Sequence, residues 1–91
     1  MSVTLQLPAV LAKLAGGRRT LDVQGATLGD VVADVARRYP GLAPRLRDEA
    51  GRPYPFVTFY LNDDDARFKG GFAASVRDGD EIIVVPAIAG G

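Results

Sequence analysis

Apolar and polar residues alternate or cluster in four short stretches of the chain, and each stretch predicts a β-strand. Residues 3–7 and 20–24 alternate between apolar and polar side chains, as half-buried strands do. Residues 56–61 and 82–86 are nearly continuous runs of β-branched and aromatic side chains, the residue types enriched in strands. Two strands are therefore expected near each end of the chain.

One long helix is predicted between these two pairs of strands. Thr27 is a good N-cap, and Pro40 with Gly41 ends the helical pattern. The apolar residues that recur at helical spacing are Leu28, Val31, Val32, Val35 and Tyr39. This apolar stripe predicts a helix that packs on one face of the sheet.

The remaining segments predict turns and loops. Residues 9–15 fit either a turn of helix or a broad loop, and residues 42–46 fit a short turn. We expect a loop over residues 48–55, turns at 62–65 and 78–80, and an irregular segment around 70–73.

The order of elements indicates an α+β fold of the β-grasp, ubiquitin-like type. A mixed four- to five-stranded sheet would carry one main helix on one face, with the first and last strands parallel at its centre. We assign residues 1–86 to this domain and residues 87–91 to a flexible C-terminal tail.

Charge and composition narrow the possible functions. Eleven basic residues balance eleven acidic ones, which argues against nucleic acid or an anionic membrane as the main partner. The chain has no Cys and no His, so it offers no thiol nucleophile, imidazole base or His/Cys zinc site. We expect no metal and no cofactor, and interpret the acidic residues Asp63, Asp64, Asp65, Asp78 and Asp80 as turn residues. We interpret Arg18-Arg19 and Arg37-Arg38 as solvated edge residues, with contacts to a partner as the alternative. A cytoplasmic location is expected because no leader or membrane span is present.

The sequence ends in Gly90-Gly91, which is the most informative local feature. Because glycine makes up about 7% of residues, chance gives such a pair at about 0.5% of chain ends. A carboxylate without neighbouring side chains can enter a narrow active site, whereas the alternative is a frayed end without function.

Three groups of residues together resemble the MoaD/ThiS family of sulfur carriers, in particular the CysO type of actinobacterial cysteine synthesis. These groups are Thr27-Leu28-Gly29-Asp30, the run from Phe56 through Asn62-Asp63 to Gly70-Gly71, and Asp78-Gly79-Asp80 followed by Pro86 and the final Gly-Gly. The resemblance covers nearly the whole chain and implies a β-grasp fold.

The resemblance also implies a function for the tail. An E1-like enzyme would adenylate the Gly91 carboxylate, next to Gly90, and a sulfur donor would convert it to a thiocarboxylate. A pyridoxal-phosphate-dependent cysteine synthase would take the sulfur, and a metallopeptidase would trim the added cysteine. The chain would be a protein cosubstrate and not an enzyme, and it carries no Walker-type ATP-binding loop.

Strand alternation suggests where such enzymes bind. If Val57, Phe59 and Leu61 face the helix, the residues between them face away. The apolar residues expected on that open face are Phe56, Tyr60, Ile83 and Val85, and Ile88 would add a contact from the tail. The alternative is that a loop covers part of this patch.

Four other functions remain open. The chain could be the small subunit of molybdopterin synthase, a carrier for thiamin or secondary-metabolite sulfur, a ubiquitin-like modifier of lysines, or a β-grasp binding module that never uses its tail.

Overall fold

The computed structural model describes residues 2–48, 50–52 and 57–86, and within them a β-sheet with one long helix against it. The strands are β1 Val3–Gln6, β2 Thr20–Val23, β3 Val57–Leu61, β4 Asp64–Asp65 and β5 Glu81–Pro86. The helices are α1 Ala9–Ala12, α2 Leu28–Arg38 and α3 Ala43–Leu46, with 3₁₀ turns at Lys13–Ala15, Ala66–Lys69 and Gly71–Ala73. None of the helices in the described ranges is long and apolar enough to cross a membrane.

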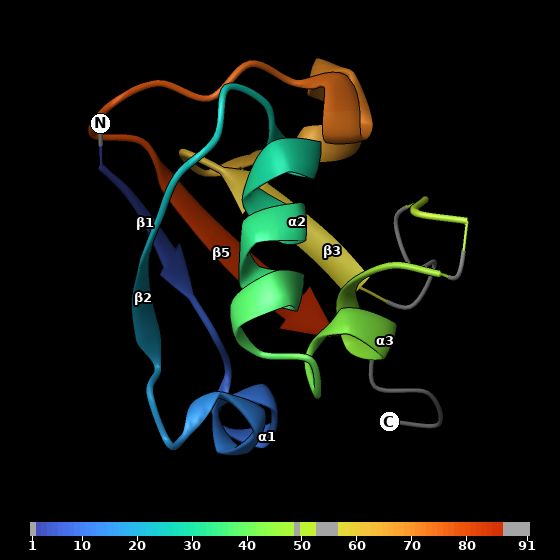
Figure 1. Ribbon diagram of the computed structural model, residues 1–91. Coiled ribbons are helices and arrows are strands. Elements are labelled where there is room, and N and C mark those ends of the chain that lie inside the picture. Colours follow the sequence, from blue (N-terminus) through green and yellow to red (C-terminus); the bar gives the residue numbers. More distant parts are fainter. Residues whose placement is uncertain (1, 49, 53–56, 87–91) are drawn as a thin grey trace.

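The sheet has the order β2-β1-β5-β3-β4 and places β5 at its centre. β1 and β5 run parallel, while β1 with β2, β3 with β5, and β3 with β4 are antiparallel. The predicted mixed sheet with parallel first and last strands is therefore confirmed. Figure 1 shows α2 lying across one face of this sheet, with α1 and α3 near the end at which β5 finishes.

α2 begins and packs as its sequence predicts. The backbone N–H of Asp30 donates to Thr27 Oγ1 at 3.2 Å, so Thr27 is the N-cap. Tyr39 follows the last helical residue and is partly buried against the core. The rest of the apolar stripe is fully buried: Leu28, Val31, Val32 and Val35. This burial supplies most of the helix's stability, because helices of this length are marginal in isolation.

Several segments form more regular structure than the sequence indicates. Residues 42–46, expected as a short turn, contain the helix α3, which buries Leu46. Residues 9–15, which could be helix or loop, form α1 and a 3₁₀ turn that bury Leu11 and Ala15. The turn expected at residues 62–65 is shorter than predicted, since Asp64–Asp65 pair with the end of β3 as β4. Asn62 and Asp63 reverse the chain within two residues by adopting positive φ angles of 50° and 74°, which Asn and Asp tolerate better than most residues.

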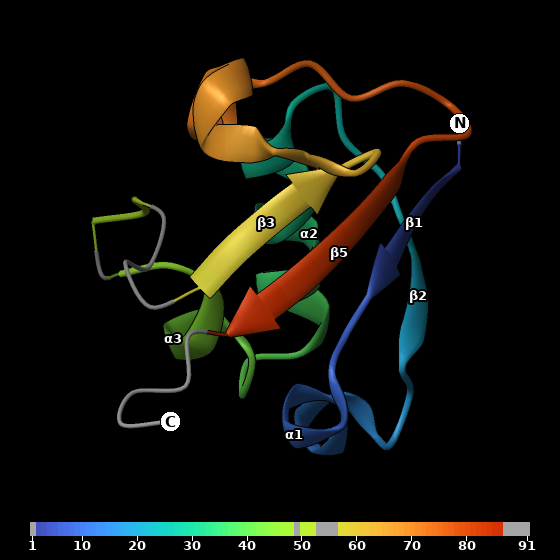
Figure 2. The ribbon, with the colours of Figure 1, turned by 180° about the vertical axis from the view of Figure 1, so that it is seen from behind.

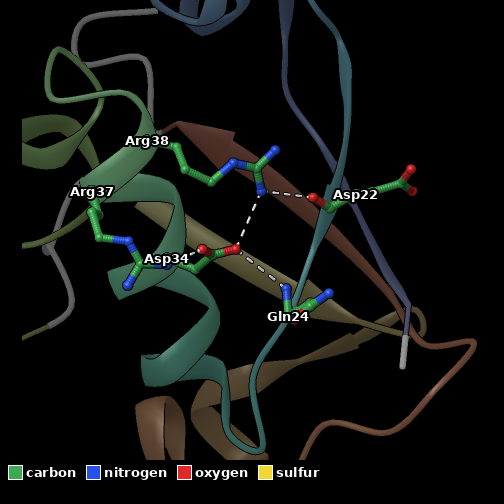
Figure 3. A network of polar contacts seen from close by, with 5 residues as sticks. All are labelled: Asp22, Gln24, Asp34, Arg37 and Arg38. Atoms are coloured by element: carbon green, nitrogen blue, oxygen red, sulfur yellow. Dashed lines mark hydrogen bonds and ion pairs between the residues drawn. The ribbon is translucent and has the colours of Figure 1, made fainter.

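A network of charged residues ties α2 to the edge strand β2 (Figure 3). Arg38 Nη1 donates to the backbone carbonyl of Asp22 at 2.7 Å and to Asp34 Oδ2 at 3.2 Å. The backbone N–H of Gln24 donates to Asp34 Oδ2 at 3.3 Å, and Arg37 Nη2 donates to Asp34 Oδ1 at 2.6 Å. Polar groups at an edge strand that have no strand partner are thereby satisfied by helix side chains.

Candidate functional site

The end of β5 is the part of the described structure from which the tail continues. Pro86, the last residue of β5, lies opposite Val57 of β3 in the antiparallel register. Phe56, Ile88, Gly90 and Gly91 lie outside the described residues. The candidate site is therefore built from the residues that surround the end of β5.

Three of the residues predicted on the open face come together there. Tyr60 lies directly opposite Ile83, and Thr58 lies opposite Val85. Val85 is 41% exposed, while Ile83 and Tyr60 are half-buried. The residues that alternate with them in β5 are Ile82 and Val84, which are buried in the core. In Figure 2, β1, β3 and β5 lie in front of α2, and no labelled helix covers them on that side.

A hollow of about 240 Å³ adjoins this apolar face at the end of β5. It is bounded by Ile83, Val85 and Pro86 on β5, and by Gln6 at the end of β1. Arg19, which precedes β2, also lines it. The backbone N–H of Leu7 donates to the Arg19 carbonyl at 2.8 Å and fixes this segment beside β1.

Sequence reasoning did not assign Gln6 or Arg19 to the site. Gln6 alternates with buried Leu5 and Leu7, so its outward direction was available from the pattern. Its position beside Ile83 depends on the parallel register of β1 with β5, which the chain order alone does not fix. Arg19 was expected at a solvated edge, with a contact to a partner as the alternative.

An ion pair borders the apolar face on the β4 side. Asp65 lies opposite Tyr60, and its carboxylate accepts hydrogen bonds from Arg67 Nε and Nη2 at 3.2 and 2.8 Å. The side-chain hydrogen bond from Arg67, with help from the Arg67 backbone N–H, holds the pKa of Asp65 below its ordinary value. This carboxylate is therefore charged and internally paired at neutral pH.

The acidic turn at the start of β5 is held by its own hydrogen bonds. Asp80 Oδ1 accepts from Asn62 Nδ2 at 2.9 Å, and Asp80 Oδ2 accepts from the Arg77 N–H at 2.8 Å. The Asn62 contact is the main reason why the pKa of Asp80 is lowered. Asp78 accepts from the Ser2 N–H at 2.6 Å. These contacts support the interpretation of Asp78 and Asp80 as turn residues.

Within the described residues, no group of three or more His, Cys, Asp or Glu side chains could hold a metal ion. A second hollow of about 370 Å³ lies beside this turn. It is lined partly by Asp64 and Lys69, whose charged groups pair at 3.4 Å.

Comparisons with known proteins agree with this architecture. The ThiS family model matches residues 5–91. The sulfur carrier protein CysO of Mycobacterium tuberculosis is 41% identical over 93 residues, with 100% of both chains covered. A chain of the Amycolatopsis orientalis BexX/CysO complex is 39% identical with a TM-score of 0.90, covering 98% of this chain and 99% of that one. Small archaeal modifier protein 1 from Haloferax volcanii is 27% identical with a TM-score of 0.82, covering 96% and 98% of the two chains. The chain therefore belongs to the ThiS/MoaD family of ubiquitin-like β-grasp proteins, as a sulfur carrier of the CysO type.

Proposed function

We propose that this protein carries sulfur as a thiocarboxylate on Gly91 and supplies it for cysteine biosynthesis. The observation that carries the proposal is the Gly90-Gly91 pair, the fourth and fifth residues after a central strand, in a chain that matches CysO carriers over its full length. Glycine has no side chain to hinder entry into an enzyme's active site. The relatives named CysO support the sulfur chemistry. The assignment to cysteine biosynthesis rests on the resemblance of this chain to actinobacterial carriers.

Two balanced steps form the thiocarboxylate. The Gly91 carboxylate attacks the α-phosphate of ATP and releases pyrophosphate, which leaves an acyl-adenylate. Hydrosulfide (HS⁻) from a sulfide source then adds to the acyl carbon, AMP departs with the electron pair of the broken C–O bond, and loss of the proton on sulfur leaves the thiocarboxylate. The first step is needed because a carboxylate is a poor electrophile. Since this chain has no Walker-type loop, an E1-like partner would bind the ATP, and we place the activation in the cytoplasm.

The open face of the sheet is the surface that we propose for partner docking. Tyr60, Ile83 and Val85 form its described apolar part, and Phe56 and Ile88 are proposed to extend it. Five residues span at most about 17 Å when extended. A partner on this face could therefore receive Gly91 in an active site near the end of β5. After sulfur loading, a pyridoxal-phosphate-dependent cysteine synthase would take the sulfur from Gly91, and a metallopeptidase would trim the added cysteine.

Lysine modification is the second candidate function. It is favoured by the likeness to a small archaeal modifier protein over nearly the whole chain. The same acyl-adenylate would then be attacked by a lysine amine of a target protein, forming an amide and releasing AMP. The two functions share the activation step and differ in the nucleophile.

Intact-protein mass spectrometry separates these possibilities. We expect incubation with the E1-like enzyme, ATP and a sulfide source to replace one oxygen of the protein by sulfur. Deletion of Gly91 should abolish this change while circular dichroism shows an intact fold. Sulfur loading that persists in the deletion variant would contradict the assignment of Gly91. Amide adducts with lysines in place of the thiocarboxylate would favour the modifier function.

Docking on the open face requires a separate test. The variants Tyr60→Asp and Val85→Asp should slow adenylation without unfolding the domain, because each puts a charge into an apolar contact. Phe68→Asp is the control, since Phe68 is 83% exposed in the 3₁₀ turn beyond β4, at the other end of β3 from Pro86. Adenylation at the wild-type rate in both test variants would refute the docking surface.

A further inference from the structure

We propose that charged residues at opposite ends of the open face fix the direction in which the activating enzyme docks. Arg19 marks the end from which the tail continues, and Asp22 with Glu81 marks the other end. The inference rests on the proposed function. It identifies the partner's chemistry: an apolar patch with an acidic group that faces Arg19 and a basic group that faces Asp22 and Glu81.

The acidic end is set by the register of three strands. Thr4 of β1 pairs with Asp22 on one side and with Glu81 on the other, so the two acidic residues lie about two strand spacings, or about 10 Å, apart. Leu21 and Ile82, their neighbours in sequence, are buried. Asp22 and Glu81 therefore point to the open side, and both are exposed. Figure 3 shows the Asp22 carboxylate directed away from Asp34 and Arg38.

The basic end lies beside the last residues of β5. Arg19 is exposed and shares its hollow with Gln6, Ile83, Val85 and Pro86. Among the described residues that line this hollow, Arg19 alone is charged. Arg19 precedes Asp22 by three positions, which corresponds to about 10 Å of extended chain. The face thus carries positive charge near the tail and negative charge about one Debye length away.

These charges have no partners of their own in the part of the chain that the structure describes. The ion pairs found there join Asp34, Asp48, Asp64 and Asp65 to nearby basic residues, and none involves Arg19, Asp22 or Glu81. The charges are therefore available to an incoming protein. By contrast, the charged pair that borders Tyr60, Asp65 with Arg67, is already neutralised.

An apolar patch by itself does not fix the orientation in which a partner docks. Burial of apolar area is non-directional, so a partner could also dock in the reversed orientation on the patch of Tyr60, Ile83 and Val85. The reversed arrangement would carry Pro86, and with it the tail, away from the partner's active site. It would also bring like charges together at both ends, and juxtaposed like charges suppress wrong pairings and slow association.

The test compares charge reversals by ATP–pyrophosphate exchange with the purified E1-like enzyme of the same organism. We expect Arg19→Glu to lower kcat/KM about tenfold at low salt, with kcat at saturation unchanged, because steering acts on association. Asp22→Lys combined with Glu81→Lys should have an effect of similar size. Raising the salt concentration should shrink both effects.

Two further variants keep the test decisive. Arg19→Gln removes the charge without reversing it and should give a smaller loss of kcat/KM than Arg19→Glu. Arg45→Glu makes the same reversal at an exposed site in α3, and should leave kcat/KM within about twofold of wild type. If Arg19→Glu and Arg45→Glu behave alike, the inference is overturned while the proposed function stands. If the wild-type protein is not adenylated at all, the proposed function fails first.

Discussion

Replacing Arg38 with alanine should destabilise the protein more than replacing its neighbour Arg37. The two arginines are adjacent in α2 and both pair with Asp34, so the substitutions are chemically matched. Arg37 is 76% exposed and makes no other hydrogen bond within the described residues. Arg38 is 38% exposed, donates to the Asp22 carbonyl at 2.7 Å and stacks 5.6 Å from the centre of the Tyr39 ring.

The magnitudes follow from these contacts. An exposed ion pair in a helix contributes about 0.3–0.5 kcal/mol, which is the full loss expected for Arg37→Ala. Arg38 adds an exposed cation–π contact of about 0.5 kcal/mol. Its charge-assisted hydrogen bond to the β2 edge contributes about 1 kcal/mol after allowance for solvent. Arg38→Ala should therefore cost about 2 kcal/mol, several times the cost of Arg37→Ala.

Urea denaturation followed by circular dichroism measures both losses on the same scale. In a thermal scan of the same variants, the midpoint should fall by about 8–15 °C for Arg38→Ala and by only a few degrees for Arg37→Ala. A double-mutant cycle with Asp34→Ala isolates the ion pair, since only part of the Arg38 effect should disappear when Asp34 is absent. Equal losses for the two arginine variants would refute the reasoning, because they would show that the bond to β2 contributes nothing.

Two other predictions concern the packing around Gly25 and the carboxylate of Asp80 in the turn before β5. A Cβ at Gly25 would lie 2.7 Å from the Val31 backbone nitrogen, so Gly25→Ala should lower the free energy of unfolding by about 1–3 kcal/mol in urea titrations. Gly41→Ala is the matched control, because its nearest contact, the Leu14 side chain at 3.7 Å, is an ordinary one. The lowered pKa of Asp80 means that its carboxylate stabilises the fold above the ordinary value of 3.8, and that this contribution is lost as the pH falls through the lowered pKa. Asp80→Asn should thus be less stable than wild type near pH 7, and the difference between their urea midpoints should shrink as the pH falls. A difference that stays constant with pH would contradict this.

Local periodicity was enough to predict most of the fold. The alternation in β1 and the helical stripe in α2 each match a face that the structure buries. The N-cap Thr27 was readable because capping depends on neighbours in sequence. The outward positions of Tyr60, Ile83 and Val85 followed from the period of two, since their neighbours in sequence are core residues.

Features that depend on contacts between distant segments were not predictable in the same way. The pairing of Asp64–Asp65 as β4 needs β3 as a template, and aspartate has a low strand propensity. Arg38 was expected at a solvated edge, yet it reaches a carbonyl sixteen residues earlier in β2. Arg19 lines the same hollow as Ile83 and Val85 because β1 pairs with β2 on one side and with β5 on the other.

The central position of β5 links the fold to the proposed chemistry. β5 pairs with β1 over Glu81–Ile83 and with β3 over Ile82–Pro86, so its pairing with β3 fixes Pro86 relative to Ile83 and Val85 on the same strand. If a partner docks on the open face as we propose, the binding energy gained there would also fix the position of Pro86, where the tail begins. Ordering residues on binding costs conformational entropy for each residue, so a fixed Pro86 would lower the cost of placing Gly91 in a partner's active site. Without its pairing to β3, the end of β5 would fray more easily and would hold Gly91 less precisely in a partner's active site.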